Sequence, residues 1–252
     1  MPRWLTRLVA GVFALGLAAG VSGAGYLYYY AHSPLGEGGS NPVQVPPGSS
    51  FQSVLRTLQE QGWIERRAEL HILGRALGVA AHIHAGEYRF RADQTPRELL
   101  HALAEGDVVQ HSVTLPEGWT VDEFLVRLRA TETLDAEELP EGPRDPALLR
   151  LLDLADRHDS AEGWLFPDTY RFTRGTDARV ILRQAHRRMQ RKLEQAWDQR
   201  VDGLPMDSAY QTLILASIVE KETAAPGERA RIAGVFINRL REGMRLQTDP
   251  TV

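Results

Sequence analysis

Two glutamates at the end of a predicted helix are the residues in this sequence best suited to acid–base chemistry. Residues 212–223 have a helical pattern, and at about 100° per residue Glu222 falls among the aliphatic side chains Leu215, Ile218 and Val219. Glu220 points to nearly the opposite side. A carboxylic acid among buried aliphatic groups keeps its proton to higher pH, which general-acid cleavage of a glycosidic bond requires. The alternative is a glutamate at the edge of a helix, paired with a nearby arginine.

Two further helices are predicted to frame this segment. Asp177 to about Trp197 forms a long helix whose outer face is basic, with Arg183, Arg187, Arg188, Arg191 and Lys192. Such a face is usually just solvated, and attraction to an anionic polymer or membrane is the functional alternative. Pro226 starts a later helix with an apolar stripe of Ile232, Val235, Phe236 and Leu240.

Composition excludes several classes of function. The 252 residues suffice for one or two domains, and the formal net charge of −4 gives no sign of nucleic-acid binding. The chain has no cysteine, so disulfides and thiolate metal sites are excluded. His82 and His84 could share a strand face, but we find no third metal ligand at a suitable spacing. We expect neither a metal nor another cofactor.

The N-terminal segment predicts a membrane anchor. Leu8 to Tyr30 is a run of about 23 residues without charge, long enough to span a bilayer. Arg3 and Arg7 precede it, which favours an N-terminus in the cytoplasm and a bulk outside. Small residues near Ala24 leave a cleaved signal peptide as the alternative. Because the run is long and leads straight into tyrosines, we favour a retained anchor, with residues 1–31 as tip and span and 32–42 as a flexible stalk.

An internal repeat follows the stalk. Val43–Gly48 and Val113–Gly118 are both a short alternating strand ending in a Pro-x-Gly turn, and each leads into an amphipathic helix. Matched residues differ by 70 in number, as in Ser50 and Thr120 at the N-cap. Tyr88-Arg-Phe90 is echoed by Tyr170-Arg-Phe172. The alternative is that strand–turn–helix segments commonly share such residues, but the matching turns favour a duplication.

We therefore predict an α+β protein. Residues 43–110 form a small unit of strand, helix, helix, strand and helix. Residues 111–252 form a second, mostly helical domain, with an inserted loop at 140–146 and a Leu-rich helix at 147–155. The chain stops in a polar stretch with no terminating element, and we expect the C-terminal part of this domain to be missing.

Several segments resemble the MltG-type (YceG-like) endolytic murein transglycosylase family. The matching stretches are residues 162–170, 216–223, 228–229, 235–240 and 243–252, and the motifs are long and specific. The resemblance implies cleavage of peptidoglycan strands between N-acetylmuramic acid and N-acetylglucosamine, leaving a 1,6-anhydro end. It also implies a LysM-like glycan-binding module at 43–110 and a C-terminal segment, completing the cleft, that this chain lacks.

The resemblance assigns roles to individual residues. The family's catalytic glutamate precedes the threonine of the 216–223 motif, which here is Glu222, and Glu220 is then a structural or neighbouring group. Candidates to support the charge that develops on the sugar ring are Asn238, Gln247, Thr248 and Asp249. Trp164, Phe166 and Tyr170 could stack on sugars and Asp168 could bind their hydroxyls, although Trp164 and Phe166 could instead be core residues. Arg239 could bind a carboxylate of a peptide stem, or pair with Glu220 or Glu228.

Two other functions remain open. One is a non-catalytic peptidoglycan-binding scaffold of the wall-synthesis machinery. The other is a hydrolytic muramidase, which needs a second carboxylate that Asp168 or Asp249 could supply. The expected location is the inner (cytoplasmic) membrane, with a single span and the bulk in the periplasm or on the outer face. The expected partners are glycan strands and, by resemblance, peptidoglycan synthases.

Overall fold

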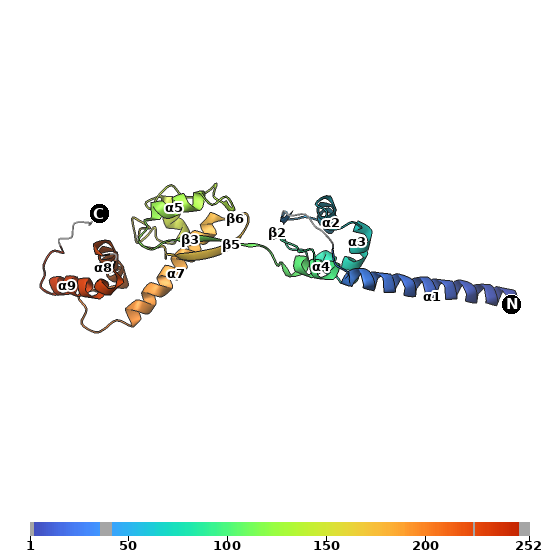
Figure 1. The fold of residues 1–252 in the computed structure, drawn as a ribbon. Coiled ribbons are helices and arrows are strands. Elements are labelled where there is room, and N and C mark those ends of the chain that lie inside the picture. Colours follow the sequence, from blue (N-terminus) through green and yellow to red (C-terminus); the bar gives the residue numbers. More distant parts are fainter. Residues whose placement is uncertain (1–2, 36–41, 224, 247–252) are drawn as a thin grey trace. The chain divides into compact units, whose positions relative to one another are not determined.

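The computed structural model describes residues 3–35, 42–223 and 225–246. The chain divides into two compact units, residues 1–110 and 111–252, and Figure 1 shows helices and short strands in both. The prediction of mixed helix and strand with one apolar helix at the N-terminus is confirmed. The finer division into tip, anchor, stalk, LysM-like module and catalytic domain stays a prediction.

The first helix, α1 (Arg3–His32), has two different ends. Its segment Ala10–His32 is long and apolar enough to cross a membrane, by length and composition alone, and a signal sequence passes the same test. The exposed side chains along it include Phe13, Leu15, Leu17 and Val21. Near its C-terminal end, by contrast, α1 packs against the core of the first unit through Leu27, Tyr30 and Ala31. The apolar helix therefore ends inside a folded unit.

The rest of the first unit has the predicted order of elements. β1 (Val43–Val45) pairs antiparallel with β2 (Gly86–Tyr88), with Val43 opposite Tyr88. Between these strands lie α2 (Phe51–Glu60), α3 (Arg67–Ala76) and the short 3-10 helix η1 (Val79–Ala81). α4 (Pro96–Glu105) follows β2 and begins with a capping box between Thr95 and Glu98. Fully buried leucines of the three helices fill the core: Leu58, Leu70, Leu99, Leu100 and Leu103.

The second unit contains two small cores. β3 (Gln110–Leu115) pairs with β5 (Asp168–Thr173), and β4 (Leu134–Asp135) pairs in parallel with β6 (Thr176–Asp177). α5 (Val121–Arg129), α6 (Pro146–Leu151) and the first half of α7 (Ala178–Asp198) pack on these strands. α8 (Ala209–Glu222), η2 (Pro226–Glu228) and α9 (Arg229–Arg241) surround a separate cluster of Leu215, Val219 and Phe236.

The two predicted repeats share their local structure. Gly48 and Gly118 have φ of 77° and 76°, the left-handed conformation that glycine adopts without strain. Ser50 and Thr120 then accept a hydrogen bond from the backbone N–H three residues later, at Ser53 and Glu123. These matching turns support the interpretation as a duplication.

The matching Tyr-Arg-Phe segments, at Tyr88 and at Tyr170, also support the interpretation as a duplication. The hydroxyl of Tyr88 donates to the carbonyl oxygen of His84 at 2.7 Å, and that of Tyr170 donates to the carbonyl oxygen of Phe166 at 2.6 Å. In both cases the acceptor lies four residues earlier, so the two strands that end the repeats are fixed in the same way.

Two element boundaries differ from the prediction. α6 ends at Leu151 rather than near residue 155, and Asp153 then adopts a left-handed φ of 56°, which stops the helix. Residues 32–35, at the start of the predicted stalk, pack against the first unit, because the Leu35 N–H donates to the carbonyl oxygen of Gln94 at 2.8 Å.

Candidate active site

The last turn of α8 presents the two glutamates in different surroundings. Ser208 caps the start of the helix, and Leu215 and Val219 are buried against α9. Glu222 is the last residue of α8 and is exposed. The carboxyl group of Glu222 forms no hydrogen bond or ion pair with any residue the structure describes.

The prediction that Glu222 is buried among aliphatic side chains is therefore wrong. The helical phase is not the cause, since Leu215 and Val219 are buried on the predicted face and Ile218 is half-buried. A helical wheel gives direction only, whereas burial also requires a neighbouring element that extends past the helix end. Glu222 lies where α8 stops, so its carboxyl group remains open to solvent.

Of the two glutamates, Glu220 is the one whose carboxylate is fixed by an ion pair. Its side chain is half-buried, and Arg229 Nη2 lies 3.0 Å from Oε2 and 3.2 Å from Oε1. The arginine pairing considered for Glu222 thus belongs to Glu220. Arg239 donates from Nη1 to the carbonyl oxygen of Leu246 at 2.6 Å and is not paired with Glu220 or Glu228, whereas its contact with a peptide-stem carboxylate stays a prediction.

The turn of the second repeat lies against this end of α8. Lys221 Nζ donates to the carbonyl oxygen of Gly118 at 3.2 Å, and a Cβ added at Gly118 would lie 3.7 Å from Glu220 Oε1. Next to this turn, Trp119 is 39% exposed. The fold thus brings the Gly118 turn, which is about 100 residues away in sequence and directly precedes the exposed Trp119, to the helix end that carries both glutamates.

The residue after Glu222 shapes the turn into α9. Thr223 is buried, and its hydroxyl donates to Glu228 Oε2 at 3.0 Å. The Thr223 hydroxyl oxygen also accepts the N–H of Ala225 at 3.0 Å. Pro226 then begins η2, as the sequence predicted. The Glu-Thr pair therefore places a free carboxyl group directly before a fixed turn.

The 162–170 motif belongs mainly to the core. Trp164 and Tyr170 are buried, and Trp164 stacks on Tyr210 with ring centroids 5.6 Å apart and planes 7° from parallel. Tyr210 is 37% exposed. For Trp164, the core alternative is the one that the structure favours, with Tyr210 as the exposed partner.

The polar groups of this motif are already engaged. Asp168 pairs with Arg188 at 2.5 Å, and the same guanidinium lies 5.4 Å from the ring centroid of the half-buried Phe166. Burial, and secondarily the Asp168 charge, raises the pKa of Tyr170 to about 12. Burial also lowers the pKa of His186, whose Nδ1 lies 3.1 Å from the carbonyl oxygen of Trp164.

The predicted site residues thus fall into two groups along α8. Trp164 lies beside Tyr210 and Gly163 beside Leu213, in the N-terminal half of the helix. Glu222 lies twelve residues beyond Tyr210, which is about 18 Å along a helix. Asn238 is exposed on α9. Gln247, Thr248 and Asp249 lie outside the described residues.

Sequence reasoning missed Trp119, Lys221 and Tyr210. The repeat already indicated a tight turn before Trp119, and the first copy has Ser49 at that position, so an aromatic residue in the second copy was a usable signal. Among the described residues, no group of three or more His, Asp or Glu side chains is placed to hold a metal ion.

Comparison with known proteins agrees with the resemblance. The sequence model of the YceG-like family matches residues 43–252. A protein of Streptococcus pneumoniae serotype 2 (strain D39 / NCTC 7466) named endolytic murein transglycosylase is 27% identical over 232 residues, covering 82% of this chain and 41% of that protein. A Bacillus subtilis (strain 168) protein of the same name is 25% identical over 230 residues, covering 83% and 61%.

A solved structure is also similar. The 2.6 Å crystal structure of a yceG-like protein from Listeria monocytogenes is 25% identical, with a TM-score of 0.44, and the alignment covers 83% of this chain and 73% of that one. The chain spans about half the length of the named relatives it matches. Because the family model matches most of its length, this chain belongs to the YceG-like family.

Proposed function

We propose that this chain is a membrane-anchored endolytic lytic transglycosylase that cleaves peptidoglycan strands between N-acetylmuramic acid and N-acetylglucosamine. The proposal is supported by membership of the YceG-like family and by relatives named endolytic murein transglycosylase. The observation on which it rests most is the exposed carboxyl group of Glu222 at the end of α8, two residues after a glutamate that is paired with Arg229.

In this proposal Glu222 acts first as an acid and then as a base. Its proton passes to the bridging oxygen as the bond from the muramic acid C1 to that oxygen breaks. The 6-hydroxyl of the same sugar attacks C1, and its proton returns to the Glu222 carboxylate. The product has a 1,6-anhydro bond and no water is consumed, so no protein nucleophile is required.

Exposure of Glu222 gives the substrate a role in preparing the acid. A glycan strand bound over the end of α8 displaces water from the carboxyl group, and a desolvated carboxyl group holds its proton more strongly. We propose that the exposed Trp119, which follows the Gly118 turn, stacks on a sugar ring of this strand, since aromatic side chains offer large apolar faces. Asn238, Arg239, Gln247, Thr248 and Asp249 stay candidates for polar contacts to the strand.

Glu220 and Arg229 have a supporting role in this scheme. Their ion pair joins the last turn of α8 to the first turn of α9, and Lys221 joins α8 to the Gly118 turn. Both contacts fix the direction in which the helix end points. Glu220 itself is a poor candidate for the acid, since both of its oxygens face the Arg229 guanidinium.

A hydrolytic muramidase is the less favoured alternative. It requires a second carboxylate to activate water or to attack the sugar. Asp168 is paired with Arg188, and its motif packs against the other half of α8. A non-catalytic glycan-binding scaffold remains the second alternative, and it predicts no cleavage at all.

One measurement, the chemical identity of the new strand ends, separates the transglycosylase, the muramidase and the scaffold. The full chain is incubated with purified glycan strands and the new ends are identified by mass spectrometry. Anhydro ends are expected, whereas reducing ends indicate hydrolysis and no new ends indicate a scaffold. Glu222→Gln is expected to lower the formation of anhydro ends by about 10²–10⁴-fold, because an amide neither donates an acidic proton nor accepts one. If it keeps wild-type activity, Glu222 is not the acid.

Glu220→Gln is the matched control. It changes the same kind of group two residues away and weakens the partly exposed ion pair with Arg229, which positions the helix end but takes no part in proton transfer, so most of the activity should remain. Circular dichroism of both variants checks that they are folded. The reverse pattern, an inactive Glu220→Gln and an active Glu222→Gln, assigns the acid to Glu220 instead.

The proposal includes location and partners. The positions of Arg3 and Arg7 favour a retained α1 anchor with a cytoplasmic N-terminus. By family resemblance, we also propose that residues 43–110 are a LysM-like module that binds glycan. Peptidoglycan synthases are proposed partners by family resemblance. N-terminal sequencing of the mature protein tests the anchor, since a start near Gly25 indicates a cleaved signal peptide.

A further inference from the structure

The anchor proposed above fixes how far the first unit stands from the bilayer. From Leu8 to Tyr26 is eighteen residues, which is about 27 Å along a helix and close to the roughly 30 Å thickness of the hydrocarbon core. Tyr26 is then at the outer boundary of the hydrocarbon. Only one turn later, Leu27, Tyr30 and Ala31 pack into the core of the first unit. The unit must therefore lie on the membrane surface.

The tip of the α2–α3 hairpin lies at the same level. Arg66, directly before α3, donates from Nη1 to the Tyr26 hydroxyl at 2.7 Å, and this hydroxyl donates to Glu69 Oε1 at 3.4 Å. A cavity of about 400 Å³ extends the junction, lined by Tyr29, Tyr30 and Trp63 among others. These contacts place the C-terminal end of α2 and the N-terminal end of α3 in the headgroup region.

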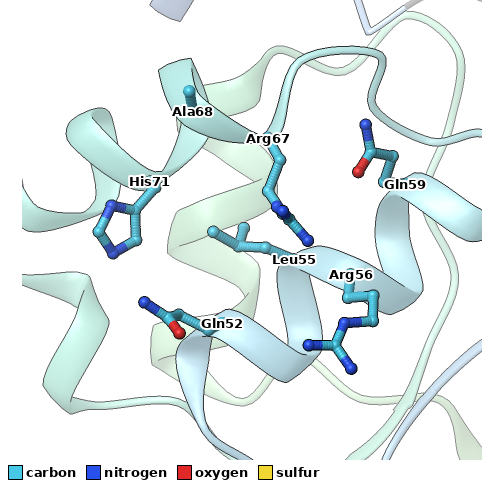
Figure 2. A pocket seen from close by; sticks show the side chains of 7 residues that line it. All are labelled: Gln52, Leu55, Arg56, Gln59, Arg67, Ala68 and His71. Atoms are coloured by element: carbon cyan, nitrogen blue, oxygen red, sulfur yellow. The ribbon is translucent and has the colours of Figure 1, made fainter.

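A second cavity opens between the two helices of this hairpin. It measures about 380 Å³ and is lined by Gln52, Leu55, Arg56 and Gln59 of α2 and by Arg67, Ala68 and His71 of α3. Figure 2 shows the side chains of Arg67 and Gln59 near one end of the groove, with Leu55 between the helices. The polar lining thus consists of two guanidinium groups, two carboxamides and an imidazole, and no carboxylate lines it.

The charges of this groove are not satisfied within the protein. Arg56 and Arg67 form no ion pair with any described residue, whereas neighbouring Arg66 is paired with Glu69 at 3.7 Å. Guanidinium groups in a shallow groove with an apolar floor suit a phosphate on an amphiphile. The position of the groove next to the headgroup level decides between sources of phosphate, because lipid headgroups are there at high local concentration.

We propose that this groove binds the phosphate of an anionic phospholipid headgroup and so seats the first unit on the outer face of the bilayer. Arg56 and Arg67 bind the phosphate, and Gln52, Gln59 and His71 donate to its remaining oxygens or to the glycerol. The inference rests on the anchor in the proposed function and concerns the orientation of the unit rather than catalysis.

Because the chain has no cysteine, a single engineered cysteine can report on the groove. Ala68→Cys is labelled with bimane and the full chain is reconstituted in vesicles of phosphatidylcholine with increasing phosphatidylglycerol. The emission at position 68 is expected to shift and saturate. Arg56→Gln with Arg67→Gln should raise the half-saturating fraction at least tenfold, since each arginine near an anionic surface contributes roughly fivefold.

Two controls isolate the groove. Arg75→Gln with Arg89→Gln removes the same charge outside it and should leave the titration unchanged. A label at Gln44→Cys, on the strand paired with β2, should not respond; Figure 1 shows β2 on the side of this unit away from α1. An equal effect of both double variants indicates a general surface charge and overturns the assignment to the groove.

The remaining outcomes separate this inference from the anchor. If carbonate washing leaves the protein in the vesicles but the label at position 68 ignores phosphatidylglycerol, the groove proposal is wrong and the anchor stands. If carbonate removes the protein, the anchor itself is contradicted. A shift caused by soluble peptidoglycan fragments in pure phosphatidylcholine vesicles assigns the groove to the carboxylates of the glycan and overturns the lipid assignment.

Discussion

Glu220 and Glu222 differ in what holds them, and this difference defines the site at the scale of residues. Glu220 is fixed by Arg229, while Glu222 is exposed and unengaged among the described residues. The sequence predicted that the two carboxylates point in opposite directions, and it also predicted the turn at Pro226. It could not predict that Glu220 is half-buried and Glu222 exposed, because burial at a helix end depends on neighbours far away in the chain.

The buried Tyr170 predicts how the stability of the fold depends on pH in the alkaline range. Burial raises its pKa to about 12, against about 10 in the unfolded chain. Between these values the unfolded state has lost the proton and the folded state keeps it, so the contribution to stability is complete below pH 10 and lost as pH rises to 12. A two-unit difference corresponds to at most about 3 kcal/mol. Tyr170→Phe should reduce the alkaline loss of stability, measured by urea unfolding at several pH values.

At neutral pH the same variant has a separate cost. It removes the hydrogen bond to the carbonyl oxygen of Phe166, which is worth about 1 kcal/mol. Tyr29→Phe is the control, because Tyr29 is 73% exposed and should change neither quantity. An unchanged alkaline slope in Tyr170→Phe would contradict the role given to this buried hydroxyl.

At the scale of elements, the repeated strand–turn–helix is the part most completely predictable from sequence. Turn glycine, capping hydroxyl and buried leucines are local signals, and all of them appear in both copies. The contacts that distinguish the copies are not local. The second turn meets the end of α8, through Gly118 and Lys221, and nothing in the spacing of the motifs indicated that contact.

The two turn glycines offer a matched pair of variants. Gly48→Ala and Gly118→Ala both place a side chain at a φ near +77°, which costs roughly 1–2 kcal/mol. Apart from the adjoining residues, no described residue has an atom within 4 Å of a Cβ added at Gly48, and a Cβ at Gly118 meets Glu220 Oε1 only at ordinary contact distance. Both variants should lose similar stability in thermal unfolding, but only Gly118→Ala should lower the rate of anhydro-end formation, because it shifts the turn that holds Lys221.

Equal losses of activity in the two variants would mean that the effect is one of stability alone. A loss confined to Gly118→Ala supports a site at the end of α8. Asparagine tolerates the left-handed conformation better than alanine does, so Gly118→Asn should recover part of the stability.

At the scale of the whole molecule, the chain builds separate cores rather than one. The leucines of α2, α3 and α4 form the core of the first unit, and α5, α6, α7 and the strands of residues 111–252 form another. The repeat made this organisation predictable, since each copy needs its own partner strand. The small cluster of α8 and α9 was predictable from their apolar stripes, but its distance from the aromatic motif at 162–170 was not.

Leu58 and Leu128 test this organisation, because they occupy equivalent positions in the two copies and both are fully buried. Truncation to alanine at such sites costs about 2–5 kcal/mol. Leu58→Ala should increase amide hydrogen exchange within residues 42–110, and Leu128→Ala within residues 111–198, each measured by mass spectrometry of peptides from the full chain. If either substitution raised exchange equally in both ranges, the two cores would form one cooperative unit, and the interpretation of the repeat as two self-contained folding elements would fail.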